Sequence, residues 1–270
     1  MKTITFLNIK GGVGKSATSI TIAHMLAEYF KKKVLIIDMD PQGNTSLTFS
    51  NINVIKYFEN LLTESEIEVE DCTIEDLLLD SQIDIHKSII HTDYPGLDII
   101  PSLLTLSEAE QMLKADITSP QQFRLANHLK AIEDEYDYCI IDCSPSINII
   151  NINALAASDE VYIPMKCDAW SGIGMCVAKR LINTVSMYSP KLKYKGCFFT
   201  QWEANKNVSK TVLELLKINV GDELLPVTIR KSKLIEEMSY MQKPLLCYDT
   251  KKGYDGVTKD YLKLTKMIMQ

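Results

Sequence analysis

The sequence predicts an α/β fold in which a mostly parallel, twisted sheet of about seven strands carries helices on both faces. Continuous apolar runs of strand length, as expected for strands buried on both faces, alternate with stretches whose apolar residues recur at helical spacing. A glycine-rich segment, Lys10–Ser16, lies between the first apolar run and the first helical stretch. Nothing between the motifs resembles a linker, so we expect residues 1–270 to form a single domain.

The expected helices and strands follow one another along the chain. Residues 15–30 have apolar side chains at helical spacing and are followed by three lysines, which are favourable near a helix C-terminus. Thr73 and Asp76 resemble a capping box and predict a short helix. Ser119 and Pro120 predict another helix, with Ser119 as N-cap and Pro120 at its first position. Further helices are expected over 173–187 and 256–269, strands over 4–7, 34–37, 97–102, 136–142, 160–164, 196–200 and 224–229, and a solvated acidic loop over 64–71.

The glycine-rich segment has the composition of a phosphate-binding loop, in which backbone N–H groups wrap a phosphate at the N-terminus of a helix. Its glycines can take backbone angles closed to other residues, so the chain can approach the phosphate closely. Lys15 would reach the β and γ phosphates of ATP, and the Ser16 hydroxyl would hold Mg²⁺. The sequence therefore predicts a P-loop NTPase. The expected nucleotide-binding residues are Gly11, Gly12, Val13, Gly14, Lys15, Ser16 and Ala17.

Three aspartates at the ends of predicted strands complete the expected site. Asp38 and Asp40 follow the apolar run 34–37 and precede a Pro and a Gly that force a turn, an arrangement suited to managing Mg²⁺ and a water molecule. Asp142 ends the apolar strand that begins near Tyr136, which is the Walker-B pattern of a carboxylate that holds Mg²⁺ through water. We therefore expect Ser16, Asp38 and Asp142 at the metal, with Asp40 beside them.

The loop departs from the common pattern because Ile9 stands where the first glycine is usual and Lys10 follows it. In this respect, and over about residues 2–265, the sequence resembles the ParA/Soj branch of the deviant Walker-A ATPases. The resemblance implies that Lys10 reaches across a homodimer to the phosphates bound by the other subunit, and that Lys10, Lys15 and Asp40 are catalytic. It also implies that Asp40 orients or activates the attacking water. The family usually has two prolines after the Walker-B aspartate, whereas Ser144 replaces the first of them here.

The same resemblance implies a DNA-segregation ATPase whose ATP-bound dimer binds DNA without sequence preference and whose hydrolysis is stimulated by a ParB-like partner. The chain resembles the short form of the family, without an N-terminal operator-binding domain. The net charge is −6, yet residues 191–270 contain 15 Lys and Arg against 9 Asp and Glu, so a basic surface is expected there. Asn205 and Leu234 stand where the family often has DNA-binding arginines. The candidate DNA contacts are therefore Lys206, Lys210, Arg230, Lys231 and Lys233.

Bulk composition favours a cytoplasmic protein, associated with the nucleoid if DNA binding holds. No apolar run approaches the ~20 residues needed to span a bilayer, and the first residues read as a strand and loop rather than a signal peptide. The 7 cysteines form no Cys-x-x-Cys pair and are expected to be reduced core thiols. The 4 histidines show no zinc spacing, so Mg²⁺ is the only metal expected.

A second function class remains open, that of a Min-type ATPase that positions a membrane-bound or other cargo. Residues 256–269 are expected to pack on the sheet, but Lys259, Lys263 and Lys266 would also suit a helix lying on a membrane surface. An iron–sulfur relative is disfavoured because no cysteine pair is placed to ligate a bridging cluster.

Overall fold

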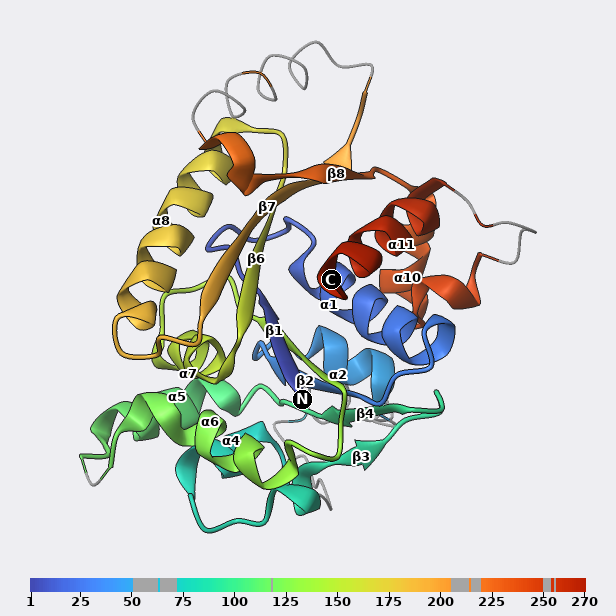
Figure 1. The fold of residues 1–270 in the computed structure, drawn as a ribbon. Coiled ribbons are helices and arrows are strands. Elements are labelled where there is room, and N and C mark those ends of the chain that lie inside the picture. Colours follow the sequence, from blue (N-terminus) through green and yellow to red (C-terminus); the bar gives the residue numbers. More distant parts are fainter. Residues whose placement is uncertain are drawn as a thin grey trace.

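The computed structural model describes residues 1–50, 63, 72–117, 119–204, 214, 220–249, 254 and 256–270. Within them, eight strands form one twisted sheet in the order β3-β4-β2-β5-β1-β6-β7-β8 (Figure 1). Neighbouring strands are parallel except for β3 and β4, which are antiparallel. The strands are β1 (Lys2–Phe6), β2 (Val34–Met39), β3 (Ile90–His91), β4 (Leu97–Ile100), β5 (Tyr138–Cys143), β6 (Glu160–Met165), β7 (Lys193–Trp202) and β8 (Leu224–Arg230).

All seven expected strands are present, and β3 is the eighth. It has only two residues, too few to show a periodicity in the sequence, and it pairs with the outer edge of β4. Each parallel strand places alternate side chains on opposite faces of the sheet, and both faces are covered, so both sets of side chains are buried. In β2, for example, Leu35 and Ile37 belong to one hydrophobic cluster and Ile36 to the other.

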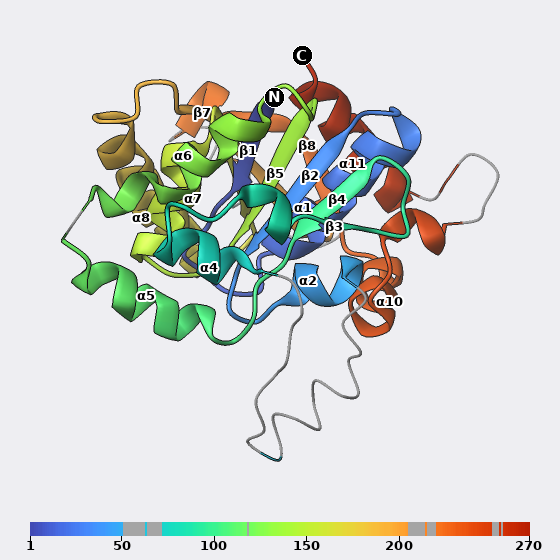
Figure 2. The same cartoon turned by 90° about the horizontal axis from the view of Figure 1, so that it is seen from below.

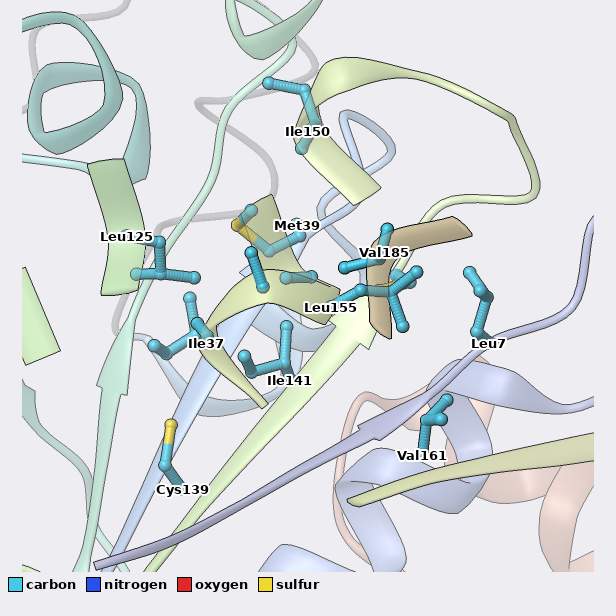
Figure 3. Packing of buried hydrophobic residues seen from close by; sticks show 14 of the residues in the cluster. Leu7, Ile37, Met39, Leu125, Cys139, Ile141, Ile150, Leu155, Val161 and Val185 are labelled. Atoms are coloured by element: carbon cyan, nitrogen blue, oxygen red, sulfur yellow. The ribbon is translucent and has the colours of Figure 1, made fainter. Parts of the chain in front are cut away.

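Helices cover both faces of the sheet (Figures 1 and 2). One cluster joins the sheet to α4, α5, α6, α7 and α8, and Figure 3 shows its centre, where Leu155 of α7 and Val185 of α8 pack near Ile141 of β5. The other cluster joins it to α1, α2, α10 and α11. The helices are α1 (Lys15–His24), α2 (Asn44–Phe49), α4 (Ile74–Leu79), α5 (Leu106–Ala115), α6 (Arg124–Leu129), α7 (Ile149–Ala157), α8 (Ala169–Ser186), α10 (Lys233–Met241) and α11 (Gly256–Ile268).

Two predicted helices differ in detail from the structure. The helix expected over 15–30 changes from α1 to a π-helical turn over Met25–Tyr29. The start predicted at Ser119 and Pro120 is wrong: Pro120 is extended and caps a 3₁₀ turn over Gln121–Phe123, and α6 begins only at Arg124. The side chain of Asn153 in α7 accounts for the later start of the helix. It donates to the Gln121 carbonyl and accepts from the Leu125 N–H, so these two backbone groups bind Asn153.

Other sequence features are confirmed or fall outside the described residues. Thr73 and Asp76 form the expected capping box at α4, with the Thr73 N–H donating to Asp76 at 2.8 Å. The acidic loop over 64–71 lies outside the described residues. None of the 7 cysteines, all of which are described, forms a disulfide, but Cys176 and Cys247 are exposed, so the prediction that they are core thiols is wrong for these two.

The α11 helix packs against the sheet, as predicted. Its apolar face is buried through Val257, Tyr261, Leu264 and Ile268, and it contacts β8 and α1. That face is therefore not available to a membrane surface. Among the described helices, none combines the length and the apolar character that crossing a bilayer requires.

A glycine in β7 fixes the way this strand joins β6. Gly196 follows a shift in the β6–β7 register and has φ +131°, and a Cβ placed on it would lie 2.4 Å from the Glu223 carbonyl oxygen. We expect Gly196→Ala to lower the free energy of unfolding by about 3 kcal/mol, because both the strained angle and the collision with backbone must be relieved.

Urea unfolding of Gly196→Ala and Gly172→Ala measures this effect. Gly172 lies in α8, and a Cβ placed on it would meet no atom of the described chain within 4 Å, so its replacement should leave stability unchanged or slightly raised. Equal stability of the two variants would contradict the prediction.

Candidate nucleotide-binding site

The phosphate loop connects β1 to α1 and is held by β7. Gly12 and Gly14 have φ +70° and +83°, angles that other residues rarely adopt, and Gly14 caps α1. The Thr200 hydroxyl donates to the Val13 carbonyl at 2.7 Å, and the Gln201 amide donates to the Gly12 carbonyl at 3.1 Å. Two carbonyls of the loop are thereby engaged outside the site, which fixes the loop at the start of α1.

A pocket of about 330 Å³ opens over this loop and the start of α1. Asp40 of the segment after β2 and Pro145 of the segment after β5 contribute to its wall. A second pocket, of about 270 Å³, adjoins the first because both are lined by Gly14, Ala17 and Gln201. The second pocket is bounded by Ile229 of β8, Ser232, Ile235 of α10 and Tyr261 of α11.

Asp142 lies at the end of β5, fully buried and level with Asp38 in the neighbouring strand. It accepts hydrogen bonds from the Ser19 hydroxyl at 3.2 Å and the Thr45 hydroxyl at 2.8 Å. Burial raises the pKa of Asp142 to about 6, although hydrogen bonds from Ser16 and Thr45 favour its charged form. A carboxylate and a hydroxyl, Asp142 and Ser16, thus meet beside the loop, and oxygen donors of this kind suit Mg²⁺.

Lys15 is also buried, with 6% of its surface exposed. Its ammonium lies 3.5 Å from the Lys10 carbonyl oxygen. Burial lowers the pKa of Lys15, whereas the nearby carboxylates of Asp142 and Asp40 raise it. The structure therefore places Lys15, Ser16 and Asp40 in the wall of the pocket, and the buried Asp142 lies beside Lys15 and Ser16.

The two aspartates after β2 have different surroundings. Asp38 is fully buried, and its oxygens accept hydrogen bonds from the Asp40 N–H and from the N–H and hydroxyl of Ser46. Burial and the nearby Asp142 carboxylate raise the pKa of Asp38. Asp40 instead lines the pocket, and its Oδ1 accepts a hydrogen bond from the Gln42 N–H at 3.0 Å.

Lys10 is directed away from the pocket of its own chain. Its ammonium contacts both carboxylate oxygens of Asp168, at 2.6 and 2.7 Å. Asp168 also caps α8 by accepting from the Ser171 N–H. The helix approaches closely at Gly174, where a Cβ would lie 3.2 Å from the Lys10 Cβ. The Lys10 side chain is thus held by α8 and does not line the pocket.

Several residues at the site were not predicted. Gln201 and Thr200 hold the loop, Thr45 binds Asp142, and the Lys166 ammonium lies 3.7 Å from a Cβ placed on Gly12. Thr200 and Gln201 lie near the end of β7, Lys166 follows β6 and Thr45 lies in the first turn of α2. A single Thr, Gln or Lys at such a place is too common to stand out in a sequence.

The candidate DNA contacts are only partly described. Lys206 and Lys210, like Asn205, lie outside the described residues. Arg230 binds Asp260 through its side chain at 2.7 and 2.9 Å, which ties β8 to α11. Lys231 lies 3.7 Å from Glu203 and is exposed, as is Lys233 at the start of α10.

Comparison with known proteins gives consistent matches over the chain. A family model described as an AAA domain matches residues 1–195. The chain is 34% identical over 272 residues to the sporulation initiation inhibitor protein Soj of Bacillus subtilis, with 99% of this chain and 98% of Soj covered. It is 31% identical over 271 residues to the chromosome partitioning protein ParA of Myxococcus xanthus, covering 99% of this chain and 87% of that protein.

A solved structure extends these matches. A putative plasmid partition protein from Borrelia burgdorferi B31, bound to AMPPNP, superposes with a TM-score of 0.75 at 29% identity, and the match covers 99% of this chain and 98% of that one.

Proposed function

The chain belongs to the ParA/Soj family of partition ATPases, and we propose that it is a Mg²⁺-dependent, dimerising ATPase that segregates DNA. The observation that carries the proposal is the convergence of Lys15, Asp40 and Asp142 on the phosphate loop. In this arrangement Lys15 supplies a cation for the phosphates, Asp142 a carboxylate for the metal, and Asp40 a carboxylate that orients the attacking water. We take residues 1–270 to act as one domain.

In this proposal the residues Gly11–Ala17 bind the phosphates of ATP. The loop N–H groups and the Lys15 ammonium neutralise phosphate charge, and Ser16 and Asp142 hold Mg²⁺, which draws electron density from the γ phosphate when bound. The second pocket receives the base, because its wall of Ile229, Ile235 and Tyr261 offers apolar surface beside the loop.

The two aspartates after β2 have separate roles in this scheme. Asp40 orients the attacking water, since its carboxylate lines the pocket beside the loop. For Asp38 we propose that it does not bind the metal directly. Its oxygens accept hydrogen bonds from Asp40 and Ser46, so it instead holds the segment that carries Asp40 beside the metal site.

Lys10 acts across the dimer in the same scheme. Its pairing with Asp168 keeps it off the nucleotide of its own subunit, so binding in trans requires that pair to open. A cation supplied in trans by one protein to the transferred phosphate of another accelerates hydrolysis by about 10³- to 10⁵-fold in GTPases. Dimerisation would therefore control hydrolysis, and a ParB-like partner would act on the dimer.

For DNA we propose a non-specific contact made by the ATP-bound dimer, which would place the protein on the nucleoid. Lys231 and Lys233 are exposed next to the second pocket. Arg230 instead pairs with Asp260 and stabilises α11. Lys206 and Lys210 remain candidates from the charge distribution of the sequence alone.

Gel shifts with duplex DNA at stated salt test this contact. We expect binding with ATP and little with ADP or without nucleotide. Lys231→Ala/Lys233→Ala should weaken it and reduce the slope of log K against log salt by about 2, because each phosphate contact contributes about 0.9. Lys193→Ala is the control, because it also removes one lysine charge but at the opposite end of β7 from Lys231. Lys193 is the first residue of β7, whereas the Lys231 N–H donates to the carbonyl of Trp202, its last residue. Equal binding in all nucleotide states, or none, would refute the segregation function.

Liposome flotation distinguishes the Min-type alternative. The buried apolar face of α11 gives no support to membrane attachment through this helix. We therefore expect no ATP-dependent flotation with anionic vesicles, and flotation without DNA binding would favour the alternative.

A further inference from the structure

The backbone of Asp40 is enclosed by a ring of four hydrogen bonds. The Asp40 N–H donates to Asp38 Oδ1 at 3.1 Å, and the Ser102 hydroxyl donates to the Asp40 carbonyl at 2.8 Å. The Ser102 N–H donates to the Ser46 hydroxyl oxygen at 2.9 Å, and that hydroxyl donates to Asp38 Oδ2 at 2.8 Å. The ring joins the end of β2, the α2 helix and the segment after β4.

Water has little access to this ring. Asp38 is 0% exposed, Ser46 and Ser102 are each 1% exposed, and Asp40 is 6% exposed. A hydrogen bond lost at such a place is not replaced by one to solvent, so buried networks of this kind hold their members in one arrangement.

The ring contains both polar backbone atoms of Asp40. Its N–H and its carbonyl belong to the two peptide planes that flank its Cα, so fixing both planes fixes the direction of the Cα–Cβ bond. The carboxylate of Asp40 therefore enters the pocket in a direction set by the ring, and its Oδ1 is further held by the Gln42 N–H.

Ser102 is itself firmly supported. On one side of it the Pro101 carbonyl accepts from the Ile74 N–H at 2.9 Å, and on the other the Leu103 N–H donates to the Glu75 carboxylate at 2.8 Å. Both partners belong to α4. The hydroxyl that reaches Asp40 thus comes from a segment anchored to a different helix from the one that follows Asp40.

We propose that Ser102 is a positioning residue for Asp40, whose hydroxyl fixes the direction of the catalytic carboxylate. The inference rests on the proposed function, in which Asp40 orients the attacking water. Misplacement of a reacting group by about 1 Å can lower a rate by about 10²-fold. The Gly43 N–H also donates to the Asp40 carbonyl, at 2.9 Å, so loss of the Ser102 hydroxyl leaves that oxygen paired but less constrained.

Steady-state ATP hydrolysis and nucleotide binding by the full chain test the proposal. We expect Ser102→Ala to lower kcat by about 10- to 100-fold. ATP affinity should stay within about 2-fold, because Lys15, Ser16 and the loop lie outside the ring. Ser102→Thr, which keeps the hydroxyl, should recover most of kcat. Ser88→Ala is the matched control, since Ser88 is fully buried and its hydroxyl has no hydrogen-bond partner within the described part of the chain.

Ser46→Ala opens the ring at a second point and provides an independent variant. If the ring acts as a unit, the double variant Ser46→Ala/Ser102→Ala should be no slower than the slower single variant, because coupled residues do not add. An unchanged kcat for Ser102→Ala, or a fall in ATP affinity that matches the fall in kcat, would overturn the role of Ser102. A wild type that binds ATP without hydrolysing it would instead overturn the proposed function.

Discussion

Lys10→Ala is expected to keep ATP affinity within about 3-fold of the wild type while lowering partner-stimulated ATP turnover by about 10³- to 10⁵-fold. The reason is geometric: the Lys10 ammonium is held by Asp168 and contributes nothing to the pocket of its own subunit, so only the dimer can use it. Binding of a fluorescent ATP analogue checks the expected affinity, and turnover measurements check the expected rate. Size-exclusion chromatography with ATP shows whether the variant still forms the dimer.

Lys15→Ala provides the contrast for that experiment. Lys15 is buried in the pocket beside Asp142 and Asp40, so its loss should weaken ATP binding itself and also remove the positive charge that lies near these two buried carboxylates. If both variants lose nucleotide affinity equally, it is wrong that Lys15 acts on the nucleotide of its own subunit and Lys10 on that of the other subunit.

Asp40→Asn is expected to lower kcat by about 10²- to 10⁴-fold with ATP affinity nearly unchanged. An amide keeps the size of the carboxylate and can still accept from the Gln42 N–H, but it carries no charge to polarise the attacking water. Single-turnover hydrolysis of bound ATP measures the chemical step without product release.

Asp80→Asn is the matched control, because Asp80, like Asp40, accepts a hydrogen bond from the N–H two residues further on, at 2.8 Å, but is exposed and does not line the pocket. It should hydrolyse ATP like the wild type. Full activity in Asp40→Asn would remove Asp40 from the mechanism.

Most of the sheet could be predicted from the sequence because strands buried on both faces read as continuous apolar runs. The β2 strand and the β5 strand are examples, and the aspartates that end them stand out because each interrupts such a run. The phosphate loop was equally visible, since Gly12 and Gly14 are required by backbone angles that other residues avoid.

The remaining site residues could not be predicted because their contacts depend on the order of strands in the sheet. Thr200 and Gln201 reach the loop because the ends of β7 and β1 lie at the same edge, on either side of β6. Ser102 reaches Asp40 because β4 lies beside β2. A lone serine or threonine after a strand carries no sign of its distant partner, and β3 is too short to produce a pattern.

The contact between α1 and α11 has a consequence for how the protein is made. The Thr18 and Tyr261 hydroxyls lie 3.3 Å apart although 243 positions separate them in the chain, and Tyr261 forms part of the wall of the second pocket. A ribosome that has already released the phosphate loop must still synthesise almost all of the remaining residues before that wall exists. In the proposed scheme, in which the second pocket receives the base, ATP cannot stabilise the growing chain through a complete site until α11 has emerged and docked.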